Sequence, residues 1–202
     1  MEYLQGYVYH IKDDYFNIVN DDKLMVNKER GQYRPTYYCE KDSSSGIIWV
    51  VPMSTRYEKF EREYNKKIEK YGRCNTIVLG NYDGKKAAFL IQNMFPITEK
   101  YLDHIHTRNG NPVPVSNKLK EEIGKRVKEV RALMKRGYKI TFPDIMRLEK
   151  VMLSELTNDK EMERNSQSLA DKIKSAQQKA DKANQETAAK NIQPKRNKGQ
   201  EL

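Results

Sequence analysis

The pattern of apolar and polar positions over residues 6–91 predicts short strands separated by turns. Its apolar runs are rich in aromatic and β-branched residues and cover residues 6–11, 37–40, 46–51, 76–79 and 87–91. The second and third runs flank a turn-rich segment at 41–45, which predicts a hairpin. The last two flank Asp83-Gly84, a pair that supplies the positive φ angles of a tight turn, and therefore predict a second hairpin.

Helical periodicity dominates the region that follows. One helix is capped by Ser116 or Asn117 and ends near Gly137, with an apolar face of Leu119, Ile123, Val127, Val130 and Met134. Another begins at Thr141, three residues before Asp144, and carries Ile145, Leu148, Met152 and Leu156 on one face. A third is expected over residues 57–71. Together these elements predict an α+β fold, a small curved antiparallel sheet or barrel with packed helices.

The chain changes character after residue 158. Phe142 is the last aromatic residue, and residues 159–202 consist mainly of Lys, Glu, Gln, Asn, Ala, Asp and Ser. A thin stripe of Leu169, Ile173, Ala176, Ala180 and Ala183 predicts a marginal, exposed helix, followed by a disordered basic stub at 194–198. We therefore expect a folded domain at 1–158 and a basic tail at 159–202 that is weakly helical or disordered. The tail is either simply solvated or docks on a partner.

Charge points to an acidic partner. The 202 residues carry 38 Lys and Arg against 28 Asp and Glu, a net charge of +10. The tail holds ten basic and seven acidic residues, a net +3, which leaves +7 on residues 1–158. The sequence has no run of about 18 apolar residues and no secretory leader pattern. Cys39 and Cys74 are far apart, as expected of reduced thiols, so we expect a cytoplasmic protein.

Familiar catalytic motifs are absent. The sequence contains no GxGxxG, GxxxxGKS or GxSxG pattern, and no cofactor is implied. The histidines are His10, His104 and His106, and the last two are expected to be exposed loop residues rather than metal ligands. We expect neither a metal site nor a cofactor.

Basic and tyrosine side chains are dense within the first sixty residues. Lysines and arginines can neutralise phosphates and tyrosine rings can stack on bases, which favours nucleic-acid binding. The basic residues are Lys23, Lys28, Arg30, Arg34, Arg56 and Lys59, and the tyrosines are Tyr7, Tyr9, Tyr15, Tyr33, Tyr37 and Tyr38. These residue types, with Ser and Thr, can also promote attack of an RNA 2′-OH on its own phosphate without a metal. The alternative is that the tyrosines are core residues and the charges a solvated face.

Four segments in succession resemble the ToxN/AbiQ family: residues 9–16 (YHIKDDYF), Arg34-Pro35, 51–55 (VPMST) and 93–97 (NMFPI). The resemblance spans residues 7–156. It implies a metal-independent endoribonuclease toxin of a type III toxin-antitoxin system, with a compact barrel related to the MazF/Kid toxins. It also implies a role in phage defence, a cellular or phage RNA substrate, and an antitoxin RNA of pseudoknot repeats that bridges protein copies in a ring.

The resemblance also assigns a catalytic set of Tyr15, Arg34, Ser54, Thr55 and Lys59. Arg34 and Lys59 would stabilise charge, Ser54 and Thr55 would orient the phosphate, and Tyr15 would assist proton transfer or stack. The family has a lysine where this chain has Tyr57, so the general acid is left open among Lys59, Arg56 and Tyr57. Further RNA contacts are expected from Lys23, Lys28, Arg30, Tyr33, Arg56 and Tyr57.

Structural roles are open for several of these residues. Tyr15 could pack in the core, Arg34 could be a surface charge, and Ser54 or Thr55 could cap the helix at 57–71. Two other functions also remain open: a non-catalytic RNA- or DNA-binding protein, and a structural adaptor that uses its tail as a partner helix.

Overall fold

A computed structural model describes residues 3–29 and 31–191, with side chains described up to residue 182. The chain divides into two compact units, Met1–Leu156 and Thr157–Leu202, and each is considered by itself.

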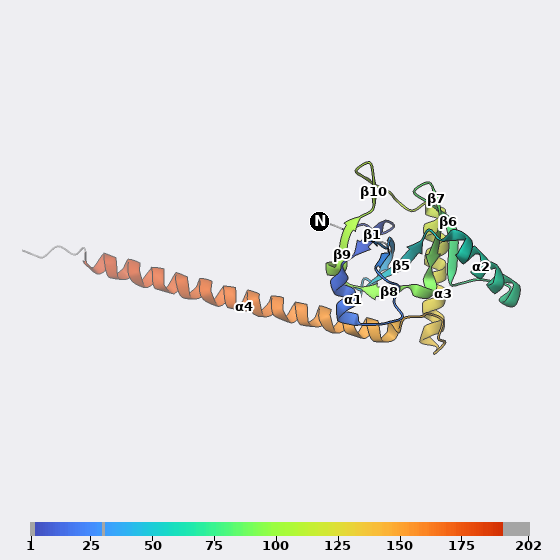
Figure 1. Ribbon diagram of the computed structural model, residues 1–202. Helices are drawn as coiled ribbons and strands as arrows, with labels where there is room; N and C mark the ends of the chain where they lie inside the picture. Colours follow the sequence, from blue (N-terminus) through green and yellow to red (C-terminus); the bar gives the residue numbers. More distant parts are fainter. Residues whose placement is uncertain (1–2, 30, 192–202) are drawn as a thin grey trace, which may run out of the picture. The chain divides into compact units, whose positions relative to one another are not determined.

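The first unit is built on a seven-stranded sheet whose pairs are all antiparallel (Figure 1). The strand order is β6-β7-β5-β4-β1-β9, and β8 pairs with β5 beside this path. The bounds are β1 (Val8–Ile11), β4 (Thr36–Lys41), β5 (Ile48–Ser54), β6 (Ile77–Tyr82), β7 (Lys85–Leu90), β8 (Phe95–Ile97) and β9 (Leu102–Ile105). With its helices this sheet confirms the predicted α+β class. A closed barrel is not formed, because the outer strands β6 and β9 do not pair with each other in the described chain.

Strand β5 lies at the centre of the unit. All seven of its residues are buried. One edge pairs with β4, while the other is shared: Ile48–Val50 pair with β8, and Met53 and Ser54 pair with β7. A strand buried on both faces reads as a continuous apolar run, which explains the sequence IWVVPM.

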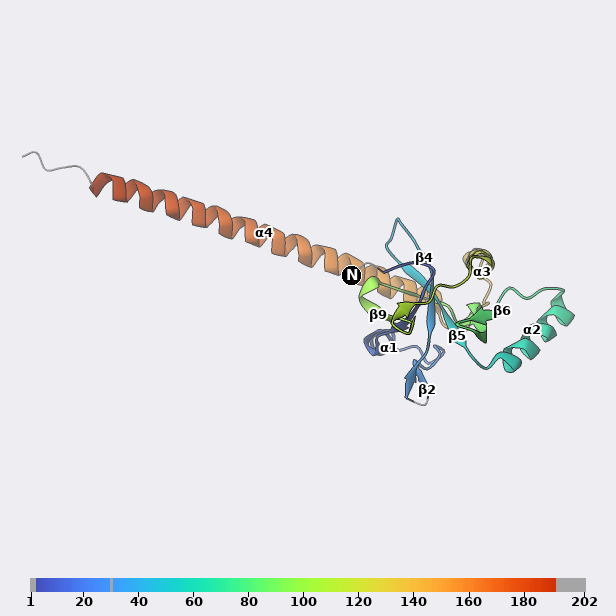
Figure 2. The same ribbon diagram turned by 90° about the horizontal axis from the view of Figure 1, so that it is seen from above.

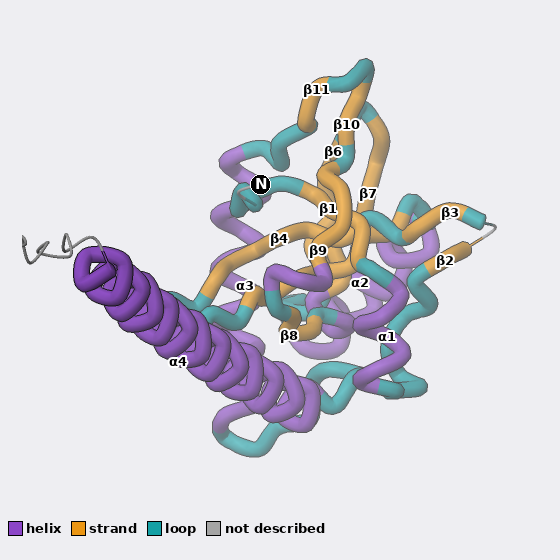
Figure 3. The backbone as a smooth tube through the Cα atoms, turned by 90° about the vertical axis from the view of Figure 1, so that its left-hand side faces the viewer, coloured by secondary structure: helices purple, strands orange, loops and turns teal. Residues whose placement is uncertain are grey.

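The β6–β7 hairpin confirms the turn predicted from Asp83-Gly84. Tyr82 pairs with Lys85, so the loop has two residues, and both have positive φ, 52° for Asp83 and 73° for Gly84. Two smaller hairpins extend from the strands, β2 (Lys28–Glu29) with β3 (Gln32–Tyr33) and β10 (Thr107–Arg108) with β11 (Asn111–Pro112), as Figure 3 shows.

Helices α2 (Tyr57–Tyr71) and α3 (Asn117–Lys135) match the predicted segments and lie beside β6 (Figure 2). Phe60 of α2 packs in a small cluster with Cys74, Ile77, Ala88 and Leu90. The predicted face of α3 joins the main core through Leu119, Ile123, Val127 and Val130. Short 3-10 turns cover Ile91–Asn93 and Glu99–Tyr101. Helix α1 (Asp13–Val19) was not predicted from the sequence.

Helix α4 (Ile145–Asn191) starts later than the sequence predicts. Asp144, not Thr141, serves its first turn, because the Asp144 Oδ1 accepts a hydrogen bond from the Arg147 N–H at 3.2 Å. The Thr141 hydroxyl instead donates to the Pro143 carbonyl at 3.1 Å. Ile145, Leu148 and Met152 are buried as expected.

The second unit is helical through Asn191, and its side chains from 160 to 182 are exposed, Leu169 and Ile173 among them. The predicted basic stub at 194–198 lies outside the described residues. No helix in the described part of the chain is long and apolar enough to cross a membrane.

Candidate functional site

A pocket of about 900 Å³ opens on the first unit. One part of its lining comes from the β2–β3 hairpin, the segment entering β4 and the end of β5: Glu29, Gly31, Gln32, Tyr33, Arg34, Pro35, Met53, Ser54, Thr55 and Arg56. The other comes from β1, the β6–β7 hairpin and the residue after β9: His10, Tyr82, Asp83, Lys85, Lys86, Ala87 and His106. The lining therefore combines cations, hydroxyls and imidazoles.

The hydroxyl pair lies at the C-terminal end of β5. Ser54 is 8% exposed, and its Oγ accepts a hydrogen bond from the Arg56 N–H at 3.2 Å. This bond closes the turn between β5 and α2, and α2 itself has no side-chain cap. Thr55 is exposed, and its hydroxyl makes no hydrogen bond with other described residues. The turn thus directs both residues to the pocket without using either to cap the helix.

Arg34 is held in place before any ligand binds. Its Nε donates to the Val26 carbonyl at 3.0 Å, and its Nη1 donates to the Met53 carbonyl at 3.3 Å. Its side chain is 12% exposed, and burial lowers the pKa of the guanidinium. An arginine remains charged at neutral pH even so. The pocket therefore contains a fixed positive charge next to the Ser54 turn.

Ion pairs organise the rim beside Arg34. Glu29 forms ion pairs with Arg34 and with Arg56. Asp13 binds Lys28, and the Tyr33 hydroxyl donates to the same carboxylate at 3.3 Å. These partners, Lys28 first, lower the pKa of Asp13. The Lys28 Nζ also lies 4.3 Å from the centroid of the Tyr33 ring.

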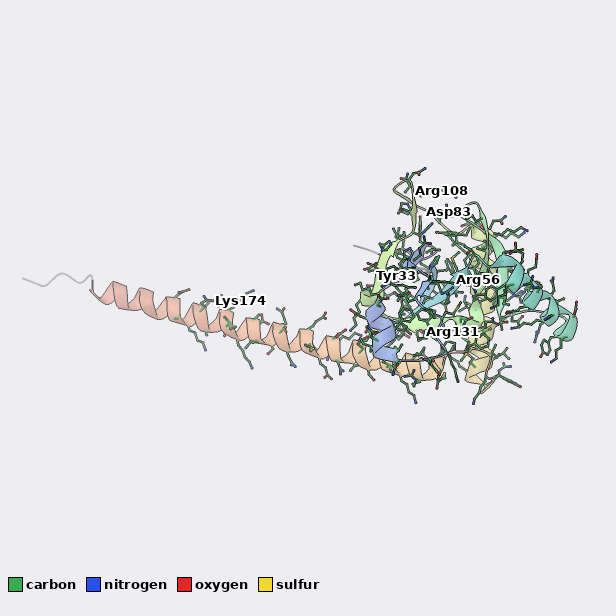
Figure 4. The ribbon with its side chains drawn as sticks, in the orientation of Figure 1. Tyr33, Arg56, Asp83, Arg108, Arg131 and Lys174 are labelled. Atoms are coloured by element: carbon green, nitrogen blue, oxygen red, sulfur yellow. The ribbon has the colours of Figure 1, made fainter. Side chains whose placement is uncertain are left out.

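Of the described residues predicted for the site, five line the pocket: Tyr33, Arg34, Ser54, Thr55 and Arg56. Figure 4 labels two of these, Tyr33 and Arg56, on the first unit. Lys28 contacts Tyr33 but does not line the pocket. Tyr57 does not line it either, but its ring centroid lies 4.9 Å from the Nζ of Lys86, which does.

The remaining predicted residues lie elsewhere. Tyr15 has no exposed surface, and its hydroxyl donates to the Pro96 carbonyl at 3.0 Å. Its ring stacks on Phe95 at 5.1 Å, so it packs in the core, where burial raises its pKa. Lys59 and Lys23 are exposed outside the pocket lining. Arg30 lies outside the described residues.

His10 and His106 line the pocket, while His104 is exposed outside the lining, and neither His104 nor His106 lies in the predicted loop. Strand β9 reaches Ile105, so residues 104 and 106 fall on one side of an extended segment beside β1, which carries His10. The His10 ring stacks on His104 at 4.4 Å, and the His106 centroid lies 6.4 Å away. In the sequence, the spacing of two residues between His104 and His106 places both on one side of the chain only if the segment is recognised as a strand.

His10 is uncharged at neutral pH. Burial, then the neighbouring His104 and His106, lower its pKa to about 4. Its Nδ1 is buried and has no hydrogen-bond partner among the described residues.

His106 has a carboxylate partner. Its Nε2 lies 3.3 Å from the Asp83 Oδ2, and Arg108 from the β10–β11 hairpin pairs with the same carboxylate. Figure 4 shows Arg108 and Asp83 near each other. The β6–β7 turn and the segment after β9 are thus joined beside the pocket.

No cluster of three or more His, Cys, Asp or Glu side chains that could hold a metal ion occurs in the described part of the chain. The groups present suit a phosphodiester: fixed and mobile cations can bind its oxygens, hydroxyls can orient it, and imidazole can exchange a proton.

No family model and no curated protein matches this sequence. Among solved structures, the chain is similar to AbiQ, described as a lactococcal anti-phage endoribonuclease belonging to the type-III toxin-antitoxin system. The TM-score is 0.52 and the identity 16%, over 74% of this chain and 97% of AbiQ. At this identity the likeness shows the fold. The resemblance to the ToxN/AbiQ family is therefore confirmed as a likeness of fold.

Proposed function

We propose that this protein is a metal-independent endoribonuclease toxin of a type III toxin-antitoxin system. It cleaves single-stranded RNA by 2′-OH attack and leaves 2′,3′-cyclic phosphate and 5′-OH ends. The fold likeness to AbiQ supports this class of protein. The observation that carries the proposal is that Arg34, Ser54, Thr55 and Arg56 line one pocket. The resemblance noted in the sequence names three of these four residues for phosphate chemistry.

The geometry suggests a role in RNA cleavage for each of these residues. Arg34 stabilises the charge that develops on the non-bridging oxygens, because its guanidinium is already fixed by two carbonyls. Ser54 and Thr55 orient the phosphate from the end of β5. Arg56, Lys85 and Lys86 attract the RNA backbone, and the Tyr33 ring offers a surface on which a base can stack. Tyr15 packs in the core and does not touch the RNA. Lys85 and Lys86 of the pocket supply the positive charge that the resemblance assigns to Lys59.

The biological setting follows the same proposal. The toxin acts in the cytoplasm on cellular or phage RNA, serves in phage defence, and is neutralised by a repeat-derived pseudoknot RNA that can bridge protein copies in a ring. The net charge of +10 favours such an RNA partner. The curved sheet is proposed to share its descent with the MazF/Kid barrels.

The test of the function is RNA cleavage in excess EDTA. Purified protein is incubated with single-stranded RNA, and the ends of the products are analysed. We expect cleavage to persist and to yield cyclic-phosphate and 5′-OH ends. Strict dependence on a divalent ion would refute the mechanism. Intact RNA that binds with a steep salt dependence would instead identify a non-catalytic binding protein.

The hydroxyl pair provides a site-specific test. The double change Ser54→Ala and Thr55→Ala removes both hydroxyls and should reduce RNA cleavage by about 10²-fold or more, since groups that stabilise transition-state charge contribute on this scale. Ser43→Ala, in the exposed β4–β5 loop outside the pocket, deletes the same group and should leave cleavage unchanged. Undiminished cleavage by the double variant, with its melting temperature preserved, would place the active site elsewhere.

A further inference from the structure

Three properties of His106 together suit it to proton transfer. It is part of the pocket lining, it is 28% exposed, and its Nε2 lies 3.3 Å from a carboxylate oxygen of Asp83. A carboxylate can only accept, so the Nε2 must carry the proton of that hydrogen bond. The Nδ1 is not used in this contact and is available to a ligand in the pocket that His106 lines.

Asp83 is itself held in position. It occupies the first position of the two-residue turn, with φ at 52°. Arg108 pairs with its carboxylate and also donates to its backbone carbonyl. Two elements, the β6–β7 turn and β10, therefore fix one side of the imidazole, which is the arrangement that orients a proton-transferring histidine.

A carboxylate and a second histidine lie beside His106. The Asp83 carboxylate is the hydrogen-bond partner of His106, while burial lowers the pKa of the neighbouring His10 to about 4, so His10 is neutral at pH 7. The titratable and charged groups that face His106 come from β1, β6 with its turn, β9 and β10: His10, Tyr82, Asp83, His104 and Arg108. Arg34 and Ser54, which are proposed to bind the phosphate, line the same pocket as His106.

We propose that His106 is the general acid of the cleavage reaction and that Asp83 is its positioning residue. This inference rests on the proposed nuclease function and supplies the proton donor that the sequence motifs leave undefined. It also gives the β9 segment a catalytic role in place of Lys59, Arg56 or Tyr57.

The 2′-oxygen forms its bond to phosphorus and releases its proton to a solvent water. The bond between phosphorus and the 5′-oxygen breaks, and its electron pair stays on that oxygen. The Nδ1 proton of the His106 imidazolium moves to the 5′-oxygen and gives the 5′-OH. A proton from solvent then restores the imidazolium.

A substrate with a sulfur in place of the bridging 5′-oxygen tests this role. A thiolate is a far weaker base than an alkoxide and leaves without protonation. On an RNA that the wild-type protein cleaves, His106→Gln should lower kcat/KM by about 10²-fold or more, the contribution of a general acid. On the 5′-thio version of the same RNA, the two proteins should differ by less than about threefold. Equal losses on both substrates, or no loss on the ordinary RNA, would overturn the inference.

The pH profile gives an independent readout. Because the protonated form of His106 is the active one, cleavage of ordinary RNA by the wild-type protein should fall as the pH rises. This alkaline limb of the pH profile should be absent in His106→Gln. Asp83→Asn removes the negative charge beside the imidazole and should move the limb to lower pH. A limb that is unchanged in both variants would overturn the assignment.

The matched control is His104→Gln, which removes an exposed imidazole outside the pocket lining and should keep wild-type kcat/KM. Melting temperatures show whether each variant is folded, and His106→Asn serves as a second variant if His106→Gln is not. A wild-type protein that fails to cleave any RNA would overturn the proposed function together with this inference. Wild-type cleavage without the substrate-dependent loss would overturn the inference alone.

Discussion

Arg34 acquires its position from the backbone around it. The two carbonyls that accept its hydrogen bonds belong to Val26, before β2, and Met53, in β5. The guanidinium is therefore bound at two points that hold its plane, its Nη2 pairs with Glu29 at 3.5 Å, and its other N–H groups are left for further acceptors. A lysine has one charged nitrogen on a flexible stem and cannot reproduce this arrangement.

This geometry predicts that Arg34→Lys is not a conservative change. We expect kcat/KM for RNA cleavage to fall by about 10²-fold, the scale for removing one preorganised donor. Arg56→Lys is the matched control, because Arg56 is 58% exposed and acts as a mobile cation, and it should cost less than about tenfold. Similar losses in the two variants would show that only the charge of Arg34 matters.

His10 predicts how stability depends on pH. Its pKa is lowered to about 4 in the folded protein against an ordinary value near 6.5, so the unfolded chain binds the proton more readily between these values. Its contribution to stability is therefore complete above about pH 6.5 and is lost as the pH falls towards 4. With allowance for partial solvent screening, we expect His10→Phe to reduce the drop in melting temperature between pH 7 and pH 4.5 by ~2–4 °C. Identical drops for both proteins would contradict this assignment.

Single residues of the site were predicted where a short motif defines a local turn. The sequence VPMST located Ser54 and Thr55, and Arg34 preceded Pro35 at the start of β4. Tyr15 could not be placed in the same way, because its burial depends on Phe95 and Pro96, some eighty residues away. His106 was missed because His104 and His106 were predicted to lie in a loop rather than along a strand.

At the scale of elements, the close contact between β6 and α3 depends on a glycine, Gly80, which has no side chain. A Cβ added at Gly80 would lie 2.5 Å from the Leu119 Cδ2 and 2.8 Å from its Cδ1. Leu119 is 8% exposed and packs in the main core, so it has little room to move. Gly80 therefore allows the helix to approach the sheet closely.

We accordingly expect Gly80→Ala to lower the free energy of unfolding by ~1–3 kcal/mol, the usual cost of overpacking. Adding Leu119→Ala should cost less in this background than in the wild type, because it removes the clash. Gly124→Ala in α3 is the matched control: nothing lies within 4 Å of its added Cβ, and helix propensity predicts a gain of ~0.5–1 kcal/mol. Urea unfolding measures these four variants and the wild type, and additive losses in the double variant would contradict the clash.

Elements defined by local chemistry were predicted well, and those defined by distant partners were not. The Asp83-Gly84 turn and the bounds of α2 follow from nearby residues. Helix α1 has seven residues, too few for its periodicity to be recognised. The sheet would close into a barrel only if β6 paired with β9. These strands start 25 residues apart and lie at opposite edges, so no local sequence pattern indicates whether they pair.

At the scale of the whole molecule, the pocket-lining residues lie between His10 and His106. The second unit begins at Thr157 and contributes none of them. Removing residues 159–202 should therefore leave kcat unchanged within about twofold. Because the deletion lowers the net charge by 3, RNA affinity should weaken moderately and lose part of its salt dependence.

Cleavage assays and binding measurements over a range of salt concentrations compare the truncated and full chains. Retained cleavage supports an enzyme whose chemistry resides in the first unit. Loss of the biological effect with cleavage intact would instead indicate an adaptor role for the tail.

Strand β5 has a consequence for genetic experiments. The segment that ends in the Ser54 turn is also the one that pairs with β4, β7 and β8, and each of its residues is buried. A selection for cells that survive expression of the gene should therefore recover two kinds of lesion a few codons apart. Those at codons 54–56 should give abundant, well-behaved protein, whereas those at codons 48–53 should give protein that aggregates or is degraded. Measuring protein abundance in the survivors would separate loss of chemistry from loss of the scaffold.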